Sequence, residues 1–289
     1  MAKIVLSKSE FKFLGLKSFI FMRSRKIYLD VVFCVDATSS MTSTINAAKK
    51  KCISIINSVK EENPSTDLMF GACFYRDPID SKEDVNELFP LSRDEKQLQL
   101  WMLKQNAIGG GDSPEDWAGC FNLVLQSIGF RRNSAKLIIH FADSCAHGIE
   151  FCGKNNHNDQ GPILTNLVQD MARSGIEIRG LSINNGANYT FMKISEIYRA
   201  VTEGGEEPTC SYEILNLDNI KETEGLLKMP PETIFSNHIK RYSISSMSSV
   251  IYRETLKMNH PTKTAPERVD PVYNLRPKII IPKNKIKKH

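Results

Sequence analysis

The 289-residue sequence contains no apolar run that approaches the roughly 20 residues needed by a membrane-spanning helix. Residues 11–22 are rich in Phe, Leu and Ile, but Lys12 and Lys17 interrupt them. No small-residue cleavage site of the kind that ends a secretory signal follows this segment. We therefore expect neither a membrane helix nor a signal peptide, and we interpret residues 1–25 as an N-terminal extension packed on the domain.

A cysteine pattern typical of a disulfide framework is also lacking, because the chain has 7 cysteines, an odd number that does not suggest such a framework. Cys34, Cys52, Cys73 and Cys120 lie inside apolar strand or helix patterns, where a free cysteine behaves as a small buried hydrophobe. Such cysteines favour a reducing compartment, so we expect a cytoplasmic protein.

The net charge of +5 is unevenly distributed along the chain. Residues 222–289 hold 13 Lys/Arg against 6 Asp/Glu, so the basic excess lies at the C-terminal end. Serines cluster in 243–249 and prolines recur in 261–282. We predict that residues 231–289 form a basic, partly disordered tail. It is either a solvated terminus or a weak contact for nucleic acid or an acidic membrane surface, without a binding module of its own.

Apolar, β-branched runs alternate with helical patterns between these two ends. The runs are typical of strands buried on both faces, and they cover 28–35, 68–75, 136–142, 177–183 and 212–217. Helical spacing of apolar residues covers 42–62, 93–106, 114–127, 163–174, 189–201 and much of 218–229. Residues 76–92 and 144–161 are expected to be irregular. This alternation predicts a doubly wound α/β domain at 26–230, with a mostly parallel sheet flanked by helices.

Oxygen-bearing side chains follow two of the predicted strands directly. Asp36, Thr38 and Ser40 come after the strand at 28–35, and Asp143 comes after the strand at 136–142. Ligands of open α/β sheets bind beyond the carboxyl ends of the strands, where the strand order reverses. If these two strands are neighbours, Asp36 and Asp143 converge.

A third loop adds Asp112, after three consecutive glycines. Carboxylates and hydroxyls without a well-placed His or Cys are the ligands of a hard cation, so we predict Mg²⁺, or else Mn²⁺. The predicted ligands are Asp36, Thr38, Ser40, Asp112 and Asp143, with Ser39 and Ser113 as accessory candidates. Asp, Thr and Ser after a strand also cap helices, which is the alternative for the first loop taken alone.

The first loop, Asp36-x-Thr38-x-Ser40, resembles the metal-ion-dependent adhesion site of von Willebrand factor A domains. Further segments resemble the A-type domain of alpha-protein kinases of the Dictyostelium type: Phe70-Gly71-x-x-x-Tyr75-Arg76-Asp77, Gly109-Gly-Gly-Asp-x-Pro-Glu115 and Ala142-Asp143-x-x-x-His147-Gly148. The resemblance covers about 30–217. The kinase domain itself is not expected, because no glycine-rich phosphate loop or catalytic-loop signature is present.

The resemblance implies a binding module rather than an enzyme. It implies a Rossmann-like sheet, a magnesium ion held by Asp36, Thr38, Ser40 and Asp143, and a protein partner whose carboxylate completes the coordination. The family's second loop supplies a threonine hydroxyl, whereas this chain has Asp112 near that place.

Three other interpretations remain open at this stage. A haloacid dehalogenase-like phosphotransferase would use Asp36 as nucleophile, but it needs a charge-balancing lysine and paired acidic residues after a late strand. The metal could instead be purely structural. Lastly, Cys145, His147, Cys152 and His157 are zinc-type donors, although their spacing fits no standard zinc motif.

Overall fold

A six-stranded sheet organises the computed structural model, which describes residues 27–80, 84–154, 156–202 and 208–215. The strand order is β3-β2-β1-β4-β5-β6, and every neighbouring pair is parallel except β2 and β3. The strands are β1 (Tyr28–Asp36), β2 (Asp67–Tyr75), β3 (Glu87–Ser92), β4 (Ala135–Ala142), β5 (Ile176–Ile183) and β6 (Cys210–Leu215). The helices are η2 (Ser39–Ser43), α2 (Ile45–Glu62), α3 (Glu95–Leu103), α4 (Trp117–Ser127), α5 (Ile149–Cys152), α6 (Gln160–Arg173) and α7 (Asn188–Val201). The predicted doubly wound, mostly parallel fold is confirmed.

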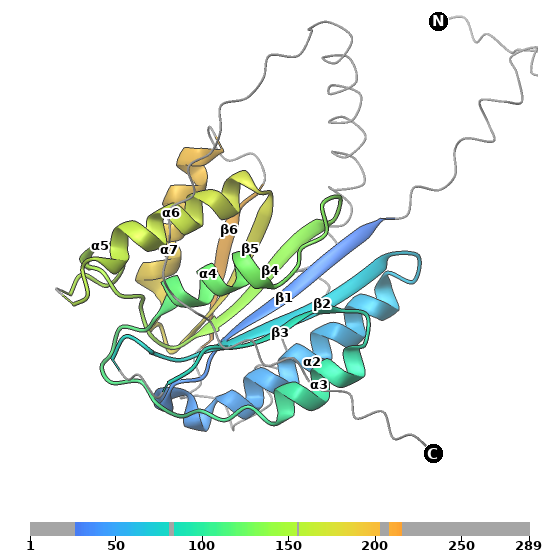
Figure 1. Ribbon diagram of the computed structural model, residues 1–289, viewed down its shortest axis with the longest axis horizontal. Helices are drawn as coiled ribbons and strands as arrows, with labels where there is room; N and C mark the ends of the chain where they lie inside the picture. Colours follow the sequence, from blue (N-terminus) through green and yellow to red (C-terminus); the bar gives the residue numbers. More distant parts are fainter. Residues whose placement is uncertain (1–26, 81–83, 155, 203–207, 216–289) are drawn as a thin grey trace, which may run out of the picture.

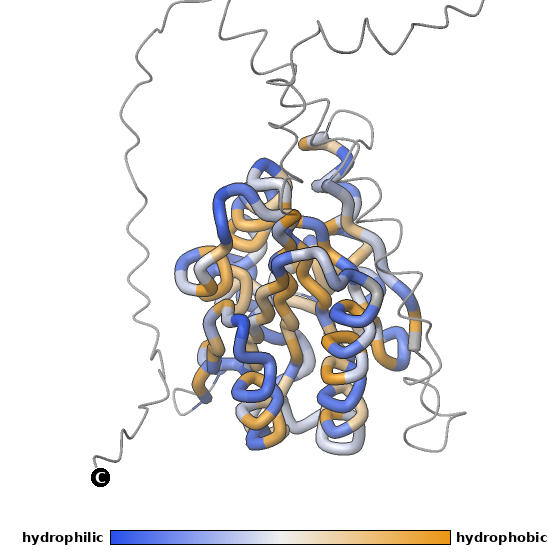
Figure 2. The backbone as a smooth tube through the Cα atoms, turned by 90° about the vertical axis from the view of Figure 1, so that its right-hand side faces the viewer, coloured by the Kyte–Doolittle hydropathy of each residue, from blue (hydrophilic) through white to orange (hydrophobic). Residues whose placement is uncertain are grey.

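Helices cover both faces of the sheet and create two hydrophobic cores (Figure 1). Successive side chains of a strand point to opposite faces, so Val31 and Phe33 of β1 enter the core beneath α2 and α3. Val32 and Cys34 enter the core beneath α4, α6 and α7. In Figure 2 apolar residues gather along the strands, while the helices alternate between polar and apolar positions. Burial on both faces explains why β1 and β4 are almost continuously apolar.

Two local predictions are wrong. Residues 87–92, expected to be irregular, form the antiparallel edge strand β3, where Pro90 is tolerated because an edge strand leaves backbone donors unpaired. The helix expected to begin near Pro114 begins at Trp117. Glu115 instead makes an isolated parallel bridge with Ala146, and the Asp116 side chain caps α4 by accepting a hydrogen bond from Gly119 N at 2.6 Å.

The segment expected to be one long loop holds the single turn α5 and the start of α6. Cys145 and Cys152 form a disulfide across it, a pairing that the odd cysteine count did not suggest. The predicted helix at 218–229, the extension at 1–25 and the tail at 231–289 lie outside the described residues, as do the predicted domain boundaries. Within the described ranges, no helix is long and apolar enough to cross a membrane.

Candidate metal centre

The strand order reverses between β1 and β4, which lie side by side in parallel register. From β1 the chain continues to α2 on one face of the sheet, and from β4 it continues to α6 on the other face (Figure 1). The loops after β1 and β4 therefore diverge and leave a crevice at the carboxyl edge. Asp36 is the last residue of β1 and Asp143 follows β4 directly, so the condition set for their convergence is met.

Four of the predicted ligands form one connected network. Asp36 Oδ1 accepts hydrogen bonds from Thr38 N at 3.0 Å and Thr38 Oγ1 at 2.7 Å. The two hydroxyl oxygens of Thr38 and Ser40 are 3.1 Å apart, and Ser40 Oγ donates to Asp143 Oδ1 at 2.9 Å. A hydroxyl has a single proton, so with both hydroxyls donating to carboxylates their lone pairs remain available to a cation.

The carboxylates of this network are crowded and buried. Asp36 is fully buried, and burial together with the charge of Asp143 raises its pKa to about 7. Burial also raises the pKa of Asp143, although the hydrogen bond from Ser40 acts in the opposite direction. Asp36 Oδ2 has no hydrogen-bond partner. In the described part of the chain no lysine or arginine forms an ion pair with either residue. A divalent cation fits this donor set, because it would supply the missing positive charge.

Glu115 is a member of this site that the sequence analysis missed. Its side chain is 2% exposed, and burial together with the charges of Asp36 and Asp77 raises its pKa to about 10. Its Oε2 is buried without a partner. The bridge to Ala146 holds the Glu115 backbone beside the loop after β4, with Glu115 N donating to Cys145 O at 2.8 Å. Its place at the end of the family-like segment Gly109-Gly-Gly-Asp-x-Pro-Glu115 was the sequence signal that could have indicated it.

Glycine at position 110 brings the second loop close to the first. Gly110 has φ +77°, and a Cβ there would lie 3.1 Å from Thr38 Cβ and 3.5 Å from Glu115 Oε1. A side chain at this position would be both strained and in contact with the network. The loop therefore lines the site mainly with backbone.

Asp112 and the accessory candidates Ser39 and Ser113 are placed differently from the four residues of the oxygen network. Asp112 is exposed, and burial followed by the charge of Asp80 raises its pKa, with His147 opposing. The charges that act on its pKa are those of Asp80, His147 and Asp77 and not that of Asp36, so its role as a ligand beside Asp36 stays a prediction. Ser39 donates through both its backbone N–H and its hydroxyl to Gly109 O, and Ser113 is exposed.

Comparison with known proteins finds similarity over the part of the chain that contains this site. Residues 30–147 match the sequence model of the von Willebrand factor A domain. Over these residues the chain is similar to von Willebrand factor A domains. The alpha-protein kinase vwkA of Dictyostelium discoideum is 32% identical over 123 residues, which are 43% of this chain and 19% of that protein. The chain therefore spans about a fifth of the length of that curated relative.

Two solved structures align with this chain at low sequence identity. The pilus adhesin SpaC from Lactobacillus rhamnosus GG aligns with a TM-score of 0.51 and 13% identity, over 75% of this chain and 31% of SpaC. The conserved hypothetical protein BatB from Bacteroides thetaiotaomicron aligns with a TM-score of 0.47 and 12% identity, over 74% of this chain and 98% of BatB. A domains commonly mediate protein interactions. The likeness to SpaC extends to the fold alone.

Proposed function

We propose that this A domain binds a protein partner through a divalent cation, Mg²⁺ or Mn²⁺, held by Asp36, Thr38, Ser40 and Asp143. The observation that carries the proposal is the single oxygen network of these four side chains at the crevice between β1 and β4. The cation would offset the charge of two crowded carboxylates and present a free coordination position to a ligand. The residues of this chain act by holding and orienting that ion.

The partner group that we propose is a carboxylate of an acidic side chain. Ser40 is exposed and Asp143 half-buried, so the network reaches the surface on the side away from Asp36. A hard cation prefers oxygen ligands, and a carboxylate adds charge complementarity. We propose no catalytic step, so the domain would act as an interaction or scaffolding module.

The test is a binding titration of full-length protein with peptides that contain a single Asp or Glu in varied contexts, in Mg²⁺ and in EDTA. We expect binding in Mg²⁺ that EDTA abolishes and that Asp36→Asn lowers at least tenfold. Arg93→Met is the matched control, because Arg93 pairs with Asp67 at the opposite end of the sheet. Binding that persists unchanged in EDTA would contradict the proposal and favour a structural metal.

The phosphotransferase alternative finds less support. Asp36 is fully buried, with one oxygen occupied by Thr38, which is a poor arrangement for a nucleophile. Within the described residues no lysine is paired with it to balance a phosphate. Trapping with beryllium fluoride at Asp36 together with a phosphatase assay separates the two proposals.

The proposed cytoplasmic location rests on cysteine chemistry. Five free cysteines are buried, as expected for a reducing compartment: Cys34, Cys52, Cys73, Cys120 and Cys210. The disulfide between Cys145 and Cys152 favours an oxidising one. Counting free thiols in protein isolated from cells under alkylation decides between them, because seven free thiols support a cytoplasmic protein and five contradict it.

A further inference from the structure

Beside the oxygen network, a second cluster gathers two histidines and three aspartates from separate loops. Asp77 and Asp80 follow β2, Asp112 precedes α4, His147 follows β4 and His157 precedes α6. One potential ligand atom each from Asp77, Asp112 and His147 lies within 4.8 Å of the others, and the same holds for Asp80, Asp112 and His157. Asp112 is common to both triads. The rings of the two histidines are in contact, with centroids 4.6 Å apart.

His147 has a nitrogen available for a ligand. Its side chain is 2% exposed, and its Nε2 is 2.7 Å from Oδ2 of Asp77, which is fully buried. Its Nδ1 is buried and has no hydrogen-bond partner. With the proton on Nε2, donated to Asp77, the lone pair of Nδ1 is free. A buried imidazole oriented by a carboxylate, with its other nitrogen free, is the usual arrangement of a metal-binding histidine.

The loop geometry brings the remaining donors close. His157 Nε2 is 2.7 Å from Asp80 Oδ1, which repeats the His147–Asp77 pairing at the surface. A Cβ on Gly111 would lie 2.8 Å from Asp80 Cβ and 2.9 Å from Asp80 Oδ2, so glycine lets Asp80 approach the backbone that carries Asp112. Cys145 and Cys152 are joined to each other, which leaves nitrogen and carboxylate as the donors.

We propose that His147, Asp112, Asp80 and His157 form a second metal site that selects a zinc-class ion, with Asp77 as the carboxylate that orients His147. Imidazole nitrogen is a ligand for zinc and its neighbours in the transition series, whereas magnesium takes oxygen. The two sites of the domain therefore differ in the chemistry of their ions. The second site stands independently of the proposed Mg²⁺-dependent partner binding.

The experiment is equilibrium dialysis of chelator-stripped full-length protein against Zn²⁺ with Mg²⁺ in excess, followed by elemental analysis. We expect Zn²⁺ to be retained by the wild type and its affinity to fall at least tenfold in His157→Gln. His157 is partly exposed, so this variant tests the site without the folding risk of His147→Gln. Substitution with Co²⁺ adds a spectroscopic check, because Co²⁺ in a site of low coordination number absorbs visible light much more strongly than hydrated Co²⁺, and His157→Gln should weaken that absorption.

Two control variants separate a loss of Zn²⁺ binding at the second site from a loss of Mg²⁺ binding at the first site and from an effect of the two cysteines. Asp36→Asn should retain Zn²⁺ fully while it loses Mg²⁺, so failure of one site is distinguishable from failure of the other. The double variant Cys145→Ser with Cys152→Ser should also retain Zn²⁺. Zinc binding that is equal in wild type and His157→Gln, or that disappears with either control, would overturn the proposal.

Discussion

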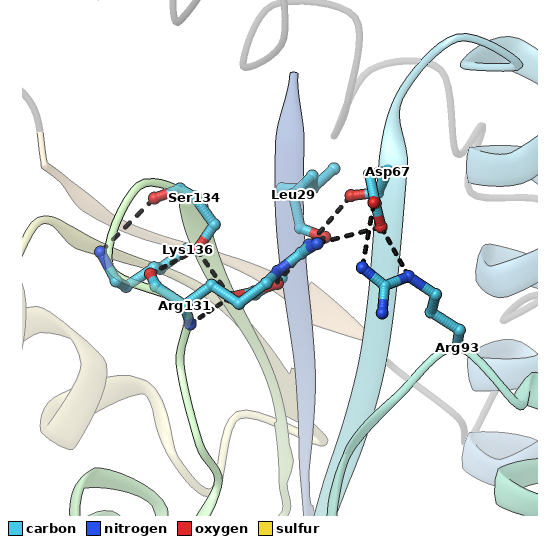
Figure 3. Close-up of polar contacts among 7 residues, drawn as sticks. Leu29, Asp67, Arg93, Arg131, Ser134 and Lys136 are labelled. Atoms are coloured by element: carbon cyan, nitrogen blue, oxygen red, sulfur yellow. Dashed lines mark hydrogen bonds and ion pairs between the residues drawn. The ribbon is translucent and has the colours of Figure 1, made fainter. Parts of the chain in front are cut away.

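The buried aspartates at the two ends of β1 have different kinds of partner. At the amino end, Asp30 of β1 and Asp67 of β2 are paired with arginines, and Arg131 bonds both. Arg93 makes two further bonds to Asp67 (Figure 3). At the carboxyl end, Asp36 and Asp143 have hydroxyls and a backbone N–H as partners, and among the described residues no lysine or arginine. The chain thus supplies cations where an aspartate is structural, and leaves the carboxyl edge in need of one from outside.

The largest effect is expected at the structural end. Arg131→Met removes the cation shared by Asp30 and Asp67 and leaves the charge of the fully buried Asp30 without its arginine partner, whereas Asp67 keeps Arg93. We expect the free energy of unfolding to fall by about 3–5 kcal/mol, measured by urea denaturation. Arg93→Met serves as the control, because Arg93 is mostly exposed and its loss should cost much less. Equal losses in the two variants would show that Arg131 is not the central cation.

At the carboxyl end, the ion should contribute a comparable stabilisation. At a free Mg²⁺ concentration about 100 times the dissociation constant, binding stabilises the fold by about 2.7 kcal/mol. We therefore expect EDTA to lower the melting temperature of the wild type measurably in a thermal scan. Asp36→Asn should show no such response to EDTA, and a response of the same size in that variant would contradict the ligand assignment.

Asp36→Asn should also stabilise the metal-free protein at alkaline pH. The folded-state pKa of Asp36, about 7, lies above the unfolded value of roughly 3.9. Its contribution to stability is therefore full below about pH 4 and is lost as the pH rises through about 7. In EDTA at pH 8 we expect the free energy of unfolding of the variant to exceed that of the wild type by up to about 4 kcal/mol, because each unit of pKa shift corresponds to about 1.4 kcal/mol. Near pH 4 the two should converge, and a constant difference across the range would disprove the titration argument.

The smallest effect is expected from Glu115→Gln. Because the pKa of Glu115 is raised to about 10, its carboxyl is protonated at neutral pH and already resembles an amide. We expect the free energy of unfolding in EDTA at pH 7 to change by less than about 0.5 kcal/mol. A larger loss in urea denaturation would mean that Glu115 is ionised and paired in the native protein.

The sequence was sufficient to predict most of this architecture, and the reasons differ by element. The runs around Val32 and Ile138 are apolar throughout, so buried parallel strands follow from composition, and their carboxyl ends locate Asp36 and Asp143. The edge strand β3 is short and contains Pro90, and its pattern is too weak to separate from a loop. The pairing of Glu115 with Ala146 depends on contacts between distant loops, which no local pattern encodes.

Asp112 shows the same limit at the level of the site. Its place in the glycine loop indicated a ligand for the ion beside Asp36, whereas its neighbours in the fold are Asp77, Asp80 and His147. The sequence locates a loop at the carboxyl edge, but the turn of that loop decides which cluster the side chain joins. Zinc and magnesium affinities of Asp112→Asn, measured side by side, would assign the residue.

The most direct measurement is calorimetric titration of Mg²⁺ into chelator-stripped full-length protein, for the wild type and Asp36→Asn. The account predicts saturable binding of one ion by the wild type and a loss of at least tenfold in affinity in the variant, with the fold unchanged by circular dichroism. Equal Mg²⁺ binding by the two proteins, or none by the wild type, would contradict the claim that the carboxyl edge of the sheet holds a cation.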